Sequence, residues 1–144
     1  MGLEYTDENR GVIQHDKRAR QIVLFDGLRW GKITPTDIDG FLDFGNRLMF
    51  FIETKFVGVS LPLGQRLALE RLCDATYKHR LKSYAFIAEH NAQQGSDIIL
   101  AEAIVTEVRH HGAWLIPRER CDVKMAVEAY LRKHGLDKYL ESST

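Results

Sequence analysis

The feature of this sequence that most constrains its fold is a pair of apolar runs separated by three turn-forming residues. Residues 38–44 and 48–57 are rich in aromatic and β-branched side chains, and Gly45, Asn46 and Arg47 lie between them. Such runs favour strands, and Gly and Asn tolerate the positive φ angle that a short hairpin turn needs. The sequence therefore predicts a β-hairpin over residues 38–57.

The length of the hairpin loop decides which side chains lie opposite one another. A two-residue loop, residues 45–46, places Asp39 opposite Ile52, whereas a three-residue loop, residues 45–47, places it opposite Glu53. A shift of one residue moves every side chain of a strand to the other face. We predict the three-residue loop, because both Gly and Asn can supply its positive φ angle.

The same hairpin brings a lysine beside two carboxylates. Glu53 and Lys55 are two residues apart on one strand, so they share a face, and Thr54 points to the other face. With the three-residue loop, Asp39, Glu53 and Lys55 form one cluster, and Phe41, Met49 and Phe51 continue that face toward a covering helix.

Two carboxylates and a lysine are suited to a hard divalent cation that acts on a phosphate ester. Mg²⁺ takes a few carboxylate oxygens, keeps several waters and binds phosphate oxygens. The main-chain carbonyl of Thr54, between Glu53 and Lys55, is a further candidate ligand. Lys55 would position a water or help to deprotonate it, and would offset negative charge that develops at phosphorus. The cluster predicts metal-assisted hydrolysis of a phosphodiester.

The remaining pattern indicates one α/β domain over residues 1–144, with a loose arm at residues 1–15. Apolar spacing predicts helices over residues 16–27, 63–81 and 123–134, and β-branched content predicts strands over residues 84–90, 98–108 and 114–116. Residues 31–36, with a glycine and a proline, are expected to form a loop.

Composition narrows the classes of partner. The formal net charge is zero, so nucleic-acid binding depends on local basic clusters, of which the best is Lys17, Arg18, Arg20, Arg29 and Lys32 with Trp30. No apolar run approaches the ~20 residues of a membrane helix, and residues 1–8 lack a signal-peptide pattern. The two cysteines do not form a Cys-x-x-Cys pair. We expect a cytoplasmic protein with free thiols and no membrane partner.

Residues 16–90 resemble the PD-(D/E)XK nuclease superfamily, which includes restriction endonucleases, junction resolvases and phage or repair exonucleases. The resemblance rests on Asp39-Gly40 at the head of a strand, Glu53-Thr54-Lys55 on the next, and a helix start at Gly64-Gln65-Arg66. It implies a restriction-endonuclease-like core, a mixed β-sheet flanked by helices in the order αβββαβ.

The resemblance also implies roles for individual residues. Asp39 and Glu53 would be the metal carboxylates, Lys55 the catalytic lysine and Gln65 a polar residue beside the site. The cofactor would be Mg²⁺, with Mn²⁺ able to substitute, the substrate DNA, and the assembly a homodimer.

The sequence departs from the family pattern at two points. Pro35 precedes Thr36 rather than an aspartate, which leaves open the choice between Asp37 and Asp39. The acidic residue that the family often adds from its first helix has two candidates, Glu8 and Asp16.

Two other function classes compete with a nuclease. One is a nucleic-acid-binding or assembly module that keeps the fold without cleavage. The other is an α/β enzyme acting on a small phosphorylated molecule, which is disfavoured because the sequence has no glycine-rich phosphate loop.

Overall fold

The computed structural model describes residues 24–77 and 81–141. Contacts divide the chain into two compact units, residues 1–35 and 36–144. In the first unit, Trp30 and Ile33 form an isolated antiparallel bridge, with both N–H···O distances at 3.0 Å. The loop predicted for residues 31–36 is confirmed. Residues 24–27 are not helical, and the rest of the helix predicted for residues 16–27 lies outside the described residues, as does the arm at residues 1–15.

The second unit is built on a five-stranded mixed sheet with the strand order β1-β2-β3-β4-β5. The strands are β1 (Gly40–Phe44), β2 (Leu48–Phe56), β3 (Lys82–His90), β4 (Ile104–His110) and β5 (Ala113–Leu115). The helices are α2 (Leu63–Thr76) and α3 (Val123–Lys133), with short 3-10 turns at Leu100–Glu102 and Asp137–Tyr139. Strands β2 and β3 are parallel and α2 connects them, while all other neighbours are antiparallel.

The β1–β2 hairpin has the predicted three-residue loop. Phe44 pairs with Leu48, and the loop residues Gly45 and Asn46 have φ angles of 63° and 59°. The Asp43 carboxylate accepts a hydrogen bond of 2.7 Å from the Asn46 amide. The prediction is confirmed because two successive residues that tolerate positive φ let the chain reverse within three residues.

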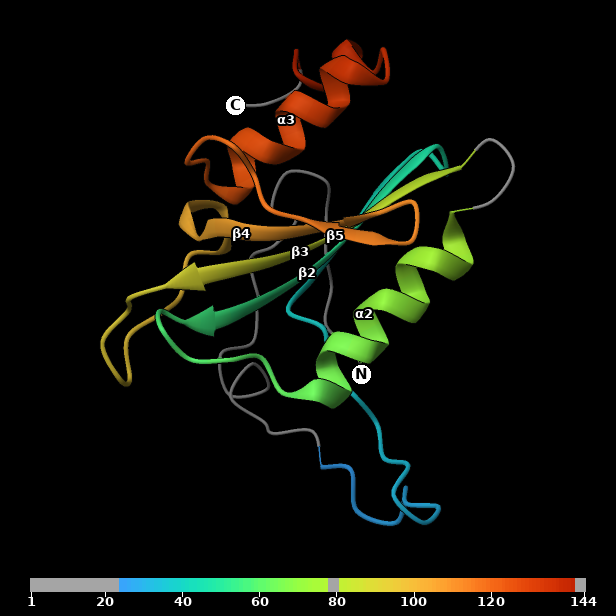
Figure 1. Cartoon of the computed structure of the whole chain (residues 1–144), viewed down its shortest axis with the longest axis vertical. Coiled ribbons are helices and arrows are strands. Elements are labelled where there is room, and N and C mark those ends of the chain that lie inside the picture. The colour runs from blue at the N-terminus through green and yellow to red at the C-terminus, as the bar shows by residue number, and fades with distance from the viewer. Residues whose placement is uncertain (1–23, 78–80, 142–144) are drawn as a thin grey trace, which may run out of the picture. The chain divides into compact units, whose positions relative to one another are not determined.

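Alternation along β2 and β3 produces two apolar layers, one on each face of the sheet. Side chains on one face pack against α3 and those on the other against α2, and Figure 1 shows the two helices on opposite sides of the sheet. The core on the α3 side includes Leu48, Phe50, Ile52, Tyr84, Phe86, Val127 and Leu131. The core on the α2 side includes Phe51, Leu61, Leu69, Cys73, Ala85 and Ile87. Phe41 stacks on Phe51 at 5.3 Å, as expected for the face that carries Glu53.

The α/β class is confirmed, with a mixed sheet and two long helices. Strands β3, β5 and helix α3 lie close to their predicted positions, and Gly135, with φ at 70°, follows α3 as expected. The predicted αβββαβ order places three strands before the second helix; the described residues have two, β1 and β2.

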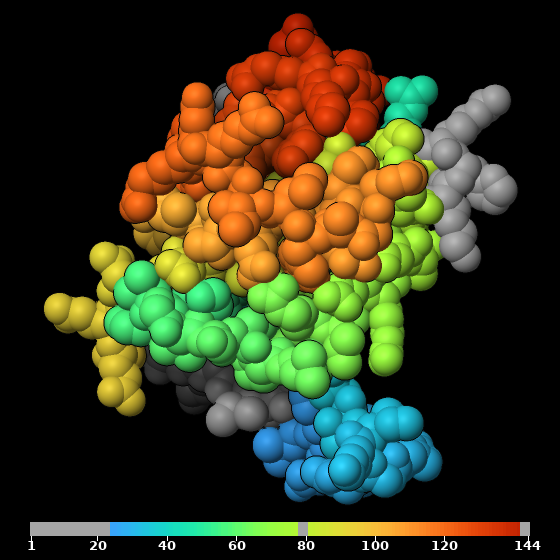
Figure 2. All heavy atoms as spheres, in the orientation of Figure 1, coloured from blue at the N-terminus to red at the C-terminus, as the bar shows by residue number. Residues whose placement is uncertain are grey.

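Two predicted elements have different bounds. The helix predicted over residues 63–81 ends at Thr76, whose hydroxyl donates to the carbonyls of Leu72 and Cys73. The strand predicted over residues 98–108 begins only at Ile104, because Leu100–Glu102 forms a 3-10 turn. Both predicted bounds were wrong because the apolar pattern of the sequence continues past the residue at which the backbone conformation changes. Strands β4 and β5 then form a hairpin that Figure 2 shows on the surface between α3 and α2.

Within residues 24–77 and 81–141, no helix combines the length and the apolar character needed to cross a bilayer. Both cysteines are free thiols, Cys73 buried and Cys121 partly so.

The hairpin loop makes a stability prediction. A Cβ at residue 45 would sit at positive φ and 2.8 Å from the Tyr139 hydroxyl, whereas a Cβ on Gly64, near the start of α2, meets nothing within 4 Å. We expect Gly45→Ala to lower the free energy of unfolding by about 1 to 2 kcal/mol. The matched change Gly64→Ala should raise it by about 0.5 to 1 kcal/mol. Urea denaturation of the full chain measures both, and equal effects of the two substitutions would contradict the account.

Candidate functional site

The register of the hairpin brings two acidic residues to the same end of the sheet. Gly40 pairs with Ile52, so Asp39, one residue earlier, lies opposite Glu53, as the sequence predicted. The exposed Asp39 is held by Thr54: its Oδ2 accepts hydrogen bonds from the Thr54 amide at 2.8 Å and from the Thr54 hydroxyl at 2.7 Å. Thr54 was expected to offer its carbonyl to a metal. The amide and hydroxyl of Thr54 orient Asp39, and the role expected of its carbonyl stays a prediction.

The carboxyl group of Glu53 has a strongly raised pKa. Its side chain is almost fully buried, with 5% exposure. Burial, followed by the negative charge of Asp39, raises the pKa of Glu53 to about 7 from an ordinary value of 4.5, although a backbone hydrogen bond from Asp39 acts in the opposite direction. Asp37 adds a smaller upward effect on this pKa. Among residues 24–77 and 81–141, no positively charged group offsets the negative charge of ionised Glu53 in this shift.

Lys55 shares the Glu53 face of β2 but binds a different carboxylate. Its Nζ lies 2.8 Å from Glu89 Oε1 and donates a second hydrogen bond of 2.7 Å to the Val59 carbonyl. Lys55 and Glu89 are direct partners in the parallel β2–β3 register. The ammonium group is thus placed at the seam between the two strands.

Sequence reasoning did not single out Glu89. It lies near the end of the strand predicted over residues 84–90, but the signal that would have found it is the register of β3 against β2. That register depends on the path of α2 and cannot be read from either strand.

The sequence left open whether Asp37 or Asp39 belongs to the site, and the structure distinguishes the two. Asp39 is held against β2 by Thr54 and acts most strongly on Glu53 among the charged groups, whereas Asp37 has the weaker effect on the same carboxyl. Asp39 is therefore the better partner for Glu53. The two candidates for an additional acid, Glu8 and Asp16, lie outside the described residues.

Gln65 is the third residue of α2 and is half-buried. In the described part of the chain, no hydrogen bond joins it to Asp39, Glu53 or Lys55, so its role beside the site stays a prediction. Its neighbour Arg66 forms two hydrogen bonds with Glu107 on β4, at 2.6 and 3.2 Å.

Ion pairs join α2 to β4, and a hydrogen bond joins it to β5. Arg109 binds Asp74, with its shortest contact at 2.7 Å, and the Trp114 ring donates through Nε1 to Glu70 at 2.7 Å. The Arg66 guanidinium lies 5.1 Å from the centre of the Trp114 ring. These charges have protein partners, so this part of the α2 face is structural.

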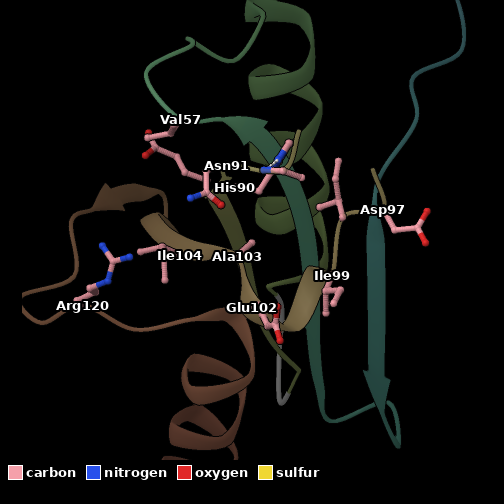
Figure 3. Close-up of a pocket in the computed structure, with 12 residues that line it drawn as sticks. Val57, His90, Asn91, Asp97, Ile99, Glu102, Ala103, Ile104 and Arg120 are labelled. Carbon is pink, nitrogen blue, oxygen red and sulfur yellow. Dashed lines mark hydrogen bonds between the residues drawn. The ribbon is translucent and has the colours of Figure 1, made fainter. Parts of the chain in front are cut away.

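A cavity of about 410 Å³ lies where β2 and β3 end (Figure 3). Glu89, Asp97, Glu102 and Arg120 are among the charged side chains that line it. The carboxylates outnumber the guanidinium, which disfavours a phosphate ligand in this cavity. Glu89 thus belongs both to the cavity wall and to the Lys55 ion pair.

The donor set restricts which metal the site suits. In residues 24–77 and 81–141, no three His, Cys, Asp or Glu side chains gather as a metal group. A structural zinc site takes four protein ligands, whereas Mg²⁺ is commonly held by one or two carboxylates and keeps several waters. A pair of carboxylates, one buried and one exposed, fits a cation of the second kind.

A comparison with protein-family models, with curated proteins and with solved structures found no match for this chain.

The buried carboxyl makes a pH prediction. Because the pKa of Glu53 is about 7 in the folded chain against 4.5 ordinarily, the folded chain keeps a proton that the unfolded chain has lost between these pH values. The stability contributed by protonated Glu53 is therefore complete below pH 4.5 and lost as the pH rises through 7. We expect Glu53→Gln to gain about 2 to 3 kcal/mol relative to the wild type between pH 5 and pH 8. Urea denaturation with a chelator present measures this difference, and a difference independent of pH would refute the shift.

Proposed function

We propose that the protein is a Mg²⁺-dependent deoxyribonuclease of the PD-(D/E)XK kind. The observation that carries the proposal is the juxtaposition of Asp39 with the buried Glu53 at the end of the hairpin, where burial and the charge of Asp39 together raise the pKa of Glu53. A divalent cation would balance that charge and allow Glu53 to remain ionised at neutral pH.

The fold supports the same reading. The Glu53-Thr54-Lys55 triplet lies near the end of β2, and α2 leads from there to β3, which is parallel to β2. Lys55 is on the same face of β2 as Glu53. The order β2, α2, β3 agrees with the last three elements, strand, helix and strand, of the αβββαβ core of the proposed family. The restriction-endonuclease-like core belongs to this proposal.

Each residue of the site has a role in the proposed reaction. Asp39 and Glu53 would hold Mg²⁺, with the Thr54 carbonyl as a further oxygen, and Mn²⁺ would substitute. When bound, the cation supplies Lewis-acid stabilisation of the phosphate and lowers the pKa of a water. The Lys55 ammonium stabilises negative charge that develops on the phosphate oxygens. The water oxygen bonds to phosphorus as the ester P–O bond breaks, one proton of the water passes through solvent to the leaving oxygen, and the other stays with the phosphate monoester that forms.

The proposal includes DNA as the partner, a homodimer as the assembly and the cytoplasm as the location. The chain has no net charge, so phosphate contacts would come from local clusters. Of the predicted basic cluster, Arg29 and Lys32 are exposed, and Lys17, Arg18 and Arg20 lie outside the described residues.

One observation favours the alternative of a nucleic-acid-binding or assembly module without cleavage. The Lys55 ammonium is paired with Glu89 instead of with either carboxylate of the proposed metal site. If that pair persisted in a complex with DNA, Lys55 would contribute structure and not catalysis. A DNA-cleavage assay distinguishes the nuclease from the binding module.

The proposal is tested by cleavage of linear, circular, branched and single-stranded DNA with Mg²⁺ or Mn²⁺. We expect metal-dependent cleavage by the wild type and a fall in rate of about 100-fold or more in Asp39→Asn, Glu53→Gln and Lys55→Met, because each removes a charge that acts on the reacting phosphate. Lys124→Met and Glu119→Gln change exposed residues of the same types and should cleave at the wild-type rate.

Cleavage that survives a chelator, or that persists in the Asp39 and Glu53 variants, would rule out this site. Binding of DNA without cleavage of any substrate would favour the binding module.

A further inference from the structure

Glu89 restrains the ammonium group of Lys55, which is on the same face of β2 as Glu53 of the proposed metal site. Lys55 and Glu53 are two positions apart on the same face of β2, or about 7 Å along the strand. The flexible lysine stem can span such a distance. In the structure, however, Lys55 Nζ lies 2.8 Å from Glu89 and 2.7 Å from the Val59 carbonyl.

Both charges of the pair are largely removed from solvent. The side chains of Lys55 and Glu89 are 15% and 24% exposed. Because screening by water is reduced there, a charge left without its partner acts strongly on its neighbours. Without the Glu89 carboxylate, the Lys55 ammonium would be free to turn toward Glu53, which lies two positions away on the same face of β2.

We propose that Glu89 is a positioning residue of this site: it holds the Lys55 ammonium at the β2–β3 seam and thereby keeps the Asp39–Glu53 pair open to a divalent cation. The ion pair satisfies one N–H of the ammonium and the Val59 carbonyl a second, which leaves the third N–H, without a partner among the described residues, in a fixed direction. The inference rests on the proposed function, since it assigns a role within the same site.

The test is a calorimetric titration of the full chain with Mn²⁺ at neutral pH. Glu89→Gln removes the charge and keeps the shape, and we expect it to weaken Mn²⁺ binding about 10-fold, as loss of a residue that orients a metal site does. Glu89→Asp keeps the charge and should stay within about threefold of the wild type. The double variant Glu89→Gln with Lys55→Met should return to wild-type affinity, because the released ammonium is gone.

Glu107→Gln is the matched control. It breaks the ion pair between Arg66 and β4, whose side chains are 30% and 26% exposed, and leaves Lys55 untouched. We expect its Mn²⁺ affinity to equal that of the wild type. Melting curves establish that each variant is folded, and Glu89→Ala replaces Glu89→Gln if the latter is not.

Wild-type affinity in the folded neutral Glu89 variant would overturn the inference. Failure of the double variant to recover would also overturn it, since Glu89 would then act on the metal directly or only on the fold. Failure of the proposed function is a separate outcome, because the wild type alone decides it. If the wild type does not bind Mn²⁺, both the proposed metal site and this inference are wrong. If it binds Mn²⁺ but does not cleave DNA, only the proposed nuclease activity is wrong.

Discussion

The site depends on the three-residue turn that joins β1 to β2. Gly45 and Asn46 both adopt positive φ, and this sets Phe44 opposite Leu48 and every earlier residue of β1 opposite its partner on β2. A loop shorter by one residue would move Asp39 to the other face. The packing of the sheet depends on the same register, because the side chains that alternate along β2 supply one apolar layer to α2 and another to α3.

The energetic cost of that arrangement is concentrated at Glu53. Its carboxyl is buried next to the charge of Asp39, which Thr54 fixes in place with two hydrogen bonds. Two negative groups held together in this way destabilise the ionised form of the pair, and the cation of the proposed function would offset that cost. Stability and proposed function are therefore opposed at this residue, as is common where a fold carries a binding site.

Much of the fold and of the candidate site could be predicted from local sequence. The features that could not be predicted share a physical cause. The hairpin, its loop and the pairing of Asp39 with Glu53 follow from turn chemistry and from the two-residue period of strands, which act over a few residues. The Lys55–Glu89 pair joins residues that are 34 positions apart through a parallel register, which only the packed helix α2 determines. The early end of α2 at Thr76 was missed because apolar spacing continues past it. Gln65 and the metal roles of Asp39, Glu53 and Thr54 stay predictions.

The most direct test of the central claim is a crystal structure of the full chain soaked in Mn²⁺, with the anomalous signal used to locate the ion. The account predicts one strong peak within about 2.0 to 2.3 Å of carboxylate oxygens of both Asp39 and Glu53, with Lys55 still bound to Glu89. A well-ordered site without a peak, or a peak at other ligands while Glu53 stays uncoordinated beside Asp39, would contradict it.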